Sequence, residues 1–141
     1  MSYLLDTDVV SELARVRPDR AVVDWISSVA DEALFLSVLT PGELRKGVES
    51  LPRGSKREQL RLWLETELPA WFGERLLPVD SAVADRWGRL VAAVKSTPPA
   101  IDSLLAATAL HHDLRLVTRN VGNCRFPGLE VVNPWRRDPA G

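Results

Sequence analysis

The chain contains very little cysteine, and this scarcity narrows the chemistry available to it. Cys124 is the single cysteine among 141 residues, so an intrachain disulfide and a cysteine-based zinc site are both excluded. No apolar run approaches the ~18 residues that a membrane span requires. The N-terminus also lacks the basic and then apolar pattern of an export signal. We therefore expect a cytoplasmic protein without a membrane segment.

The chain also lacks an excess of either charge. Its formal net charge is −1, which is not the overall basic character of a protein that coats nucleic acid. The positive residues nevertheless gather in two stretches, one running from Arg45 to Arg61 and the other from Arg115 to Arg137. These stretches are either solvated faces or a rim that binds a polyanion, and both interpretations stay open. The candidates for contact with a polyanion are Arg53, Lys56, Arg57 and Arg119.

The hydrophobic pattern predicts one α/β domain over residues 1–141, in which about residues 136–141 form a polar tail. Short apolar runs at 3–5, 33–38, 75–79, 114–118 and 129–132 are typical of buried strands. Segments with apolar residues at helical spacing separate these runs, and such alternation indicates parallel pairing with right-handed crossovers. Pro78 places the third strand near an edge of the sheet. Helices on either side of Leu51–Ser55 would form a hairpin.

Three acidic residues fall where strands or loops give way to helices, namely Asp6, Glu43 and Asp102. Each has a structural explanation of its own. Asp6 could stabilise a turn, Glu43 could form a capping box with Thr40, and Asp102 could favour the start of its helix. Asp8 could cap the first helix. If the three acids converge at the carboxyl edge of the sheet, their repulsion would be relieved by a hard divalent cation such as Mg²⁺.

Five motifs, in their order and spacing, resemble those of a PIN domain, and more narrowly a VapC toxin of the FitB-like branch. They are LLDTDVVSEL at 4–13, TPGEL at 40–44, IDSLLAATA at 101–109, TRN at 118–120 and VNPW at 132–135. The resemblance covers essentially the whole chain. It implies a three-layer α/β fold with a parallel five-stranded sheet in the order 3-2-1-4-5, carrying a helical hairpin as a clip.

The resemblance also implies a function. Members of this family are metal-dependent endoribonucleases that leave a 5′-phosphate and a 3′-hydroxyl on single-stranded RNA. The acids that match Asp6, Glu43 and Asp102 would bind Mg²⁺ or Mn²⁺ and position the attacking water. The usual partner is a VapB antitoxin whose C-terminal segment blocks the site, and the toxin usually forms a homodimer.

The loop after the fourth predicted strand departs from the family pattern. The family has an acid at the position that Asn123 occupies here. An amide oxygen can still bind a metal weakly, but it brings no charge, so occupancy of a second metal is in doubt. Hydrogen bonds around the acids are expected from Thr7, Ser11, Thr118 and Asn120.

Two other functions remain open from the sequence. Asp6 to Val10 also matches the Asp-x-Asp-x-Thr/Val signature of haloacid dehalogenase phosphatases, in which Asp6 would be the nucleophile and Asp8 the acid. The late acidic pair that this chemistry needs is absent from the sequence. Alternatively, the chain is a non-catalytic PIN-like module that binds RNA or an antitoxin, and Asn123 marks the lost activity.

Overall fold

The computed structural model describes residues 1–136 and contains a five-stranded sheet in which all neighbouring strands run parallel. The strands are β1 (Tyr3–Leu5), β2 (Leu34–Ser37), β3 (Leu76–Leu77), β4 (Arg115–Val117) and β5 (Val131–Val132). Their order is β3-β2-β1-β4-β5, which confirms the predicted topology and places β3 at an edge. β2 to β5 are shorter than the apolar runs that predicted them. Residues 137–141 of the predicted polar tail lie outside the described residues.

Helices occupy most of the chain between the strands. They are α1 (Thr7–Leu13), α2 (Arg20–Ser27), α3 (Leu39–Ser50), α4 (Ser55–Leu62), α5 (Leu68–Phe72), α6 (Ser81–Ala93) and α7 (Ala100–His111). A π-helix, Trp63–Glu67, joins α4 to α5 without a break. The segment predicted as loop after β4 contains a 3-10 turn at Val121–Cys124.

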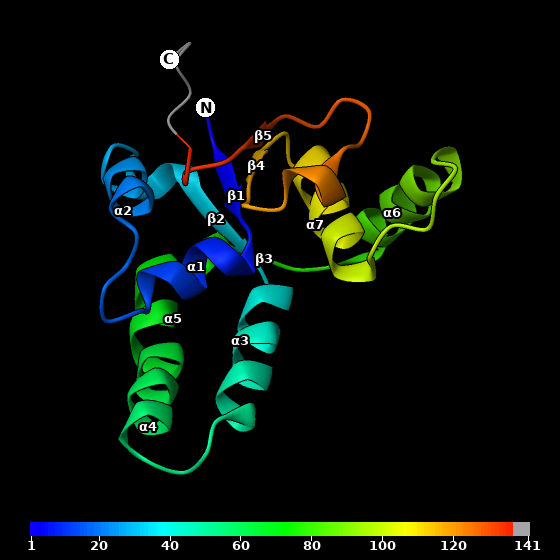
Figure 1. Ribbon diagram of the computed structural model, residues 1–141. Coiled ribbons are helices and arrows are strands. Elements are labelled where there is room, and N and C mark those ends of the chain that lie inside the picture. Colours follow the sequence, from blue (N-terminus) through cyan, green and yellow to red (C-terminus); the bar gives the residue numbers. More distant parts are fainter. Residues whose placement is uncertain (137–141) are drawn as a thin grey trace.

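The sheet separates two hydrophobic layers, as the family resemblance implied. α1, α2 and α5 lie on one side of the sheet, and α6 and α7 lie on the other (Figure 1). Because successive side chains of a strand point to opposite faces, Leu5 and Val117 belong to the first layer, whereas Leu4 and Leu116 belong to the second. All four side chains are fully buried. β1 and β4 are thus held on both faces at the point where the acidic site begins.

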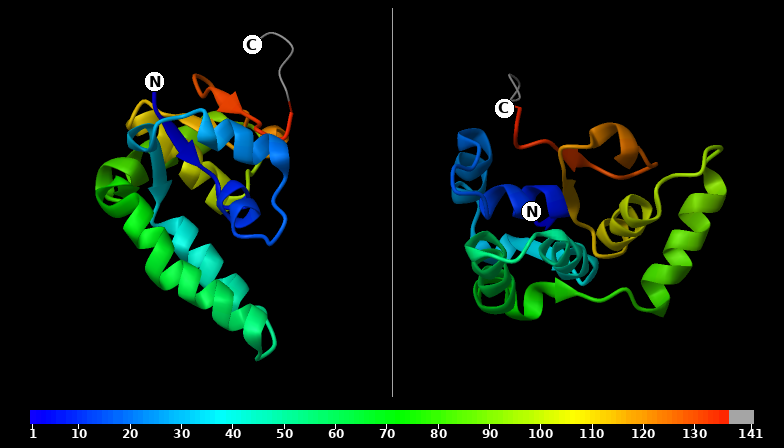
Figure 2. Two further views of the ribbon diagram at one scale, coloured as in Figure 1. Left: turned by 90° about the vertical axis from the view of Figure 1, so that its left-hand side faces the viewer. Right: turned by 60° about the horizontal axis from the view of Figure 1, so that its bottom comes forward.

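α3 and α4 form the predicted helical hairpin, which extends beyond the sheet as a clip (Figure 2). Two ion pairs link its arms: Arg45 to Glu65 at 3.1 Å and Arg57 to Glu49 at 2.8 Å. Each such exposed pair contributes little stability, but it neutralises a positive charge that would otherwise face the solvent. Within residues 1–136, no helix is both long and apolar enough to cross a membrane.

A single core leucine tests the importance of the central strands. Leu116 is fully buried, and we expect Leu116→Ala to lower the free energy of unfolding by about 3 kcal/mol through lost burial and a new cavity. Val16 is 95% exposed, so Val16→Ala should change it by less than about 0.5 kcal/mol. Chemical denaturation followed by circular dichroism measures both. Equal losses in the two variants would contradict the burial of β4.

Candidate functional site

Asp6 stands at the carboxyl end of β1 and is held there by three hydrogen bonds. Its backbone N–H donates to the carbonyl of Val117 on β4, at 2.8 Å. Its carboxylate accepts from the Thr7 amide through Oδ1 at 2.7 Å, and from the Thr118 hydroxyl through Oδ2 at 2.6 Å. Asp6 is therefore the N-cap of α1, and the prediction that Asp8 caps this helix was wrong. Burial raises the pKa of Asp6, while the hydrogen bonds from Thr118 and Thr7 act to lower it.

Glu43 reaches the same region from α3. Its Oε1 accepts a hydrogen bond from the Thr7 hydroxyl at 2.5 Å, and the Thr40 hydroxyl lies 3.2 Å from that of Thr7. The predicted capping box between Thr40 and Glu43 was wrong because α3 already begins at Leu39, which places Thr40 inside the first turn. Glu43 therefore bonds across to α1 rather than back to its own helix.

Asp102 lies in the first turn of α7, as predicted. Burial raises its pKa, and the negative charges of Asp6 and Glu43 raise it further, whereas a hydrogen bond from the Asn123 side chain lowers it. Asp102 is thus within electrostatic range of both other acids. Asn123 belongs to the 3-10 turn after β4, and its role as a weak metal ligand stays a prediction.

Asp8 lies beside these acids, although the nuclease interpretation of the sequence did not include it. Its Oδ2 accepts a hydrogen bond from the backbone amide of Arg119 at 3.0 Å. Its Oδ1 is buried and has no hydrogen-bond partner among the described residues. Burial and then the charge of Asp6 raise the pKa of Asp8 to about 6, with a smaller contribution from Asp102. The signal in the sequence was a second acid two residues after Asp6, which we interpreted as a helix cap.

The residues predicted to support the acids do so unequally. Thr7 and Thr118 donate hydroxyl hydrogen bonds directly to Glu43 and Asp6. Asn120 acts through its backbone amide, which donates to the Thr118 hydroxyl at 3.1 Å. Ser11 lies beside Glu43 in the wall of a groove and makes no direct contact that would orient an acid.

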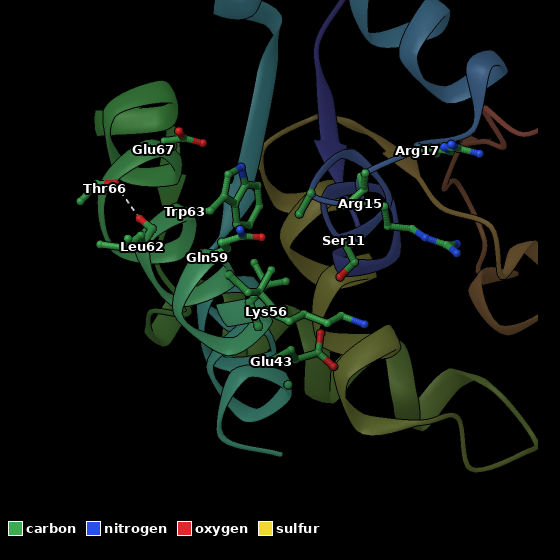
Figure 3. A pocket seen from close by; sticks show the side chains of 15 residues that line it. Ser11, Arg15, Arg17, Glu43, Lys56, Gln59, Leu62, Trp63, Thr66 and Glu67 are labelled. Carbon is green, nitrogen blue, oxygen red and sulfur yellow. Dashed lines mark hydrogen bonds between the residues drawn. The ribbon is translucent and has the colours of Figure 1, made fainter. Parts of the chain in front are cut away.

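The groove runs between α1 and the clip and has a volume of about 920 Å³ (Figure 3). α1 and the loop after it form one wall, with Ser11 and Arg15, and the clip forms the other, with Glu43, Lys56 and Trp63. The side chains of Lys56, Ser11 and Glu43 point toward one another in Figure 3. The groove therefore leads from an apolar region of the clip to one of the three predicted catalytic acids.

The four predicted RNA-contacting residues are in different environments. Lys56 lines the groove. Arg57 bonds Glu49 and, together with Arg53, lines a separate charged depression on the clip. The guanidinium of Arg119 lies over the ring of Trp135, 5.0 Å from its centroid. Of the four, Lys56 is the one the structure places beside a predicted catalytic acid.

The oxygen-rich donor set suits a hard divalent cation. As the side chains stand, the described part of the chain holds no group of three histidine, cysteine or acidic residues close enough to bind a metal. Mg²⁺, however, keeps several of its waters and requires only one or two direct carboxylates. Nearby negative charges raise the pKa values of Asp8 and Asp102, and Oδ1 of Asp8 has no hydrogen-bond partner among the described residues; a cation would relieve both. We conclude that these residues fit such an ion.

Comparison with known proteins identifies the family. A family model described as PIN domain matches residues 3–128. The chain belongs to the PIN domain family. It is 40% identical over 136 residues to VapC ribonuclease Y4jK of Sinorhizobium fredii, an alignment that covers 94% of this chain and 96% of the relative. It is 38% identical over 135 residues to toxin FitB of Neisseria gonorrhoeae, covering 94% and 97% of the two chains.

A solved relative has the same architecture along its whole length. The crystal structure of FitAcB from Neisseria gonorrhoeae matches this PIN domain with a TM-score of 0.88 and 36% identity, covering 96% of this chain and 99% of that one. The match confirms the predicted family and fold. It also favours the nuclease interpretation of Asp6 to Val10 over the phosphatase interpretation.

The raised pKa values predict how the stability of the metal-free protein depends on pH. The folded state holds protons on Asp8 up to about pH 6, whereas an unfolded aspartate releases them near 3.8. Stability due to Asp8 is therefore present at low pH and is lost as the pH rises through about 6. We expect the Tm of the metal-free parent, relative to Asp8→Asn, to fall between pH 5 and 7.5. A difference of about 1 kcal/mol in the free energy of unfolding would appear as a shift of about 4 °C in Tm.

The comparison with the variant is necessary because His112 acts in the opposite direction. Burial lowers the pKa of His112, so its contribution to stability grows as the pH rises through its ordinary range. Asp8→Asn leaves that contribution in place. Asp85→Asn is the control, because Asp85 is exposed on α6 and pairs with Arg89. Parallel pH profiles for the parent and Asp8→Asn would show that Asp8 is not buried among the other acids.

Proposed function

We propose that this PIN domain is a divalent-metal-dependent endoribonuclease that cleaves single-stranded RNA and acts as the toxin of a toxin–antitoxin pair. The observation that supports this most strongly is the gathering of Asp6, Glu43 and Asp102, from three separate elements, at one edge of the sheet. A relative with 40% identity is named a ribonuclease, and one with 38% identity is named a toxin.

The positions of the side chains suggest a role for each residue of the site. Asp6, Asp102 and Glu43 would hold Mg²⁺ or Mn²⁺, with Asn123 as a weak additional ligand. When bound, such an ion lowers the pKa of water and neutralises charge on the phosphodiester. Thr7 and Thr118 fix the Asp6 carboxylate through hydrogen bonds of 2.7 and 2.6 Å, so its lone pairs have a set direction. Glu43 lines the groove and can accept a proton from a water there.

The antitoxin partner and the oligomer belong to the same proposal. A chain that cleaves cellular RNA needs a partner that restrains it, and the groove beside Glu43 is large enough for an extended peptide segment. We propose that a VapB-type antitoxin occupies it. A homodimer remains a prediction, which light scattering of the purified protein measures.

The second candidate, a non-catalytic module, is favoured by one observation. Asn123 stands where the family has an acid, and it donates to Asp102 instead of adding charge. A module of this kind would bind RNA or the antitoxin without cleaving. The next experiment separates the two candidates.

Substitution of the central acids tests the enzymatic proposal. We expect Asp6→Asn and Asp102→Asn each to reduce cleavage of single-stranded RNA by more than about 100-fold, because loss of supporting groups alone costs about 10–100-fold in metal sites. Mg²⁺-dependent appearance of 5′-phosphate ends is the measurement. Asp85→Asn should cleave as the parent does. A parent that binds RNA but shows no cleavage with Mg²⁺ or Mn²⁺ would favour the non-catalytic module.

The basic residues give a matched pair for RNA binding. Lys56 faces the groove, whereas Arg57 bonds Glu49 at 2.8 Å. We expect Lys56→Ala to weaken RNA binding and to reduce the slope of log affinity against log salt by about 0.7, the value for one phosphate contact on a single strand. Arg57→Ala should leave the slope nearly unchanged. Fluorescence anisotropy with labelled RNA on the Asp6→Asn background avoids cleavage. The opposite ranking would move the RNA path to the charged depression that Arg53 and Arg57 line.

A further inference from the structure

Loss of the family's fourth acid leaves the proposed centre one charge short. Asn123 lies in the 3-10 turn after β4, and its side chain acts to lower the pKa of Asp102 through a hydrogen bond. An amide has no charge with which to balance a cation, so Asp6, Glu43 and Asp102 alone would supply three negative charges. Divalent affinity in all-oxygen sites falls as ligand charge is removed.

Asp8 stands directly beside this deficit. The same loop that carries Asn123 donates the Arg119 amide to Asp8 Oδ2 at 3.0 Å. Asp6 is two residues away, and it is tied to that loop by the Thr118 hydroxyl. The charges of Asp6 and Asp102 both act on Asp8, so its carboxylate is within electrostatic range of the proposed metal ligands.

A purely structural role accounts for only half of the Asp8 carboxylate. Holding the loop requires one acceptor oxygen, which an asparagine would supply equally well. The second oxygen, Oδ1, is buried without a hydrogen-bond partner among the described residues. A buried carboxylate oxygen with no donor is unfavourable, and native proteins rarely keep one unless an ion or water compensates it.

We propose that Asp8 supplies the fourth negative charge of the divalent-metal centre, in place of the acid that Asn123 replaces. The inference rests on the proposed function, since it concerns the same ion. In this chain the charge has moved from the loop after β4 to the first turn of α1, and the Arg119 amide holds Asp8 in place. Oδ1, which has no hydrogen-bond partner among the described residues, is the atom that would bind the ion, directly or through a water.

Isothermal titration calorimetry of the full-length, metal-free protein with MnCl₂ tests this inference. We expect Asp8→Asn to weaken Mn²⁺ binding by about tenfold, a typical loss when a group supporting a metal site is removed. Asn123→Asp should tighten binding. The double variant Asp8→Asn, Asn123→Asp should recover an affinity close to that of the parent, because it carries the same number of charges. Asp85→Asn is the control for a surface carboxylate.

Two readouts separate loss of charge from loss of structure. Asn keeps an acceptor oxygen for the Arg119 amide, so the metal-free Tm of Asp8→Asn at pH 7.5 should equal or exceed that of the parent. Asp8→Ala removes the acceptor as well, and its Tm should fall below that of Asp8→Asn. Asp8→Asn binding Mn²⁺ as the parent does would overturn the proposal. So would an Asp8→Asn that loses its fold, because the buried oxygen would then be needed for folding rather than for the ion.

The outcome for Asp6→Asn shows which proposal has failed. If the parent binds no Mn²⁺, the metal-dependent function and the role of Asp8 are both wrong. If Asp6→Asn abolishes Mn²⁺ binding while Asp8→Asn leaves it unchanged, the function stands and the role of Asp8 alone is wrong. Failure of the double variant to recover affinity would show that an acid at position 123 cannot replace the acid at position 8 in metal binding.

Discussion

The main constraint on this site is the repulsion among the carboxylates that the parallel sheet brings together at one edge. Asp6, Asp8 and Asp102 all have raised pKa values, with burial as the largest cause and neighbouring acids adding to it for Asp8 and Asp102. In a medium that screens less than water, such charges cost several times what they would on the surface. The fold meets this cost with fixed donors, and these donors come from α1 and from the loop after β4.

The donors form one connected network because β1 and β4 are neighbours. The Asp6 amide extends the β1–β4 pairing to Val117, which places Thr118 opposite the Asp6 carboxylate. The next residue, Arg119, then turns its amide to Asp8, and the Asn120 amide returns to the Thr118 hydroxyl. Residues separated by more than 100 positions in the sequence are thus fixed to one another by the register of two short strands.

The sequence predicted the order of the elements, and it missed details that depend on the residue at which each helix begins. Strand order, the clip and the placement of Asp102 in the first turn of α7 follow from apolar periodicity and the family motifs. The cap of α1 and the partner of Glu43 did not follow. Both depend on where the backbone begins to turn: Asp6 is already the cap, and Thr40 is already helical, which frees Glu43 to meet Thr7 on another helix.

Asp8 was missed for a related reason. An acid near the start of a helix is ordinarily explained by the helix itself, and no pattern in the sequence reports that one of its oxygens is buried without a donor. That fact depends on Arg119, which is 111 residues away and satisfies only the other oxygen.

The arrangement of positive charge has a consequence for the proposed function. Arg45, Arg57 and Arg61 on the clip are each paired with a glutamate, and Arg119 lies over Trp135. Lys56, Arg15 and Arg17 line the groove with Glu43, and Arg15 also lies 3.5 Å from Glu12. An RNA phosphate approaching this edge therefore meets several carboxylates, which repel it, as well as these basic residues. A divalent cation would reduce that repulsion by neutralising part of the negative charge of the carboxylates. Metal and RNA would then strengthen each other's binding by the same factor, since the coupling between two ligands is reciprocal.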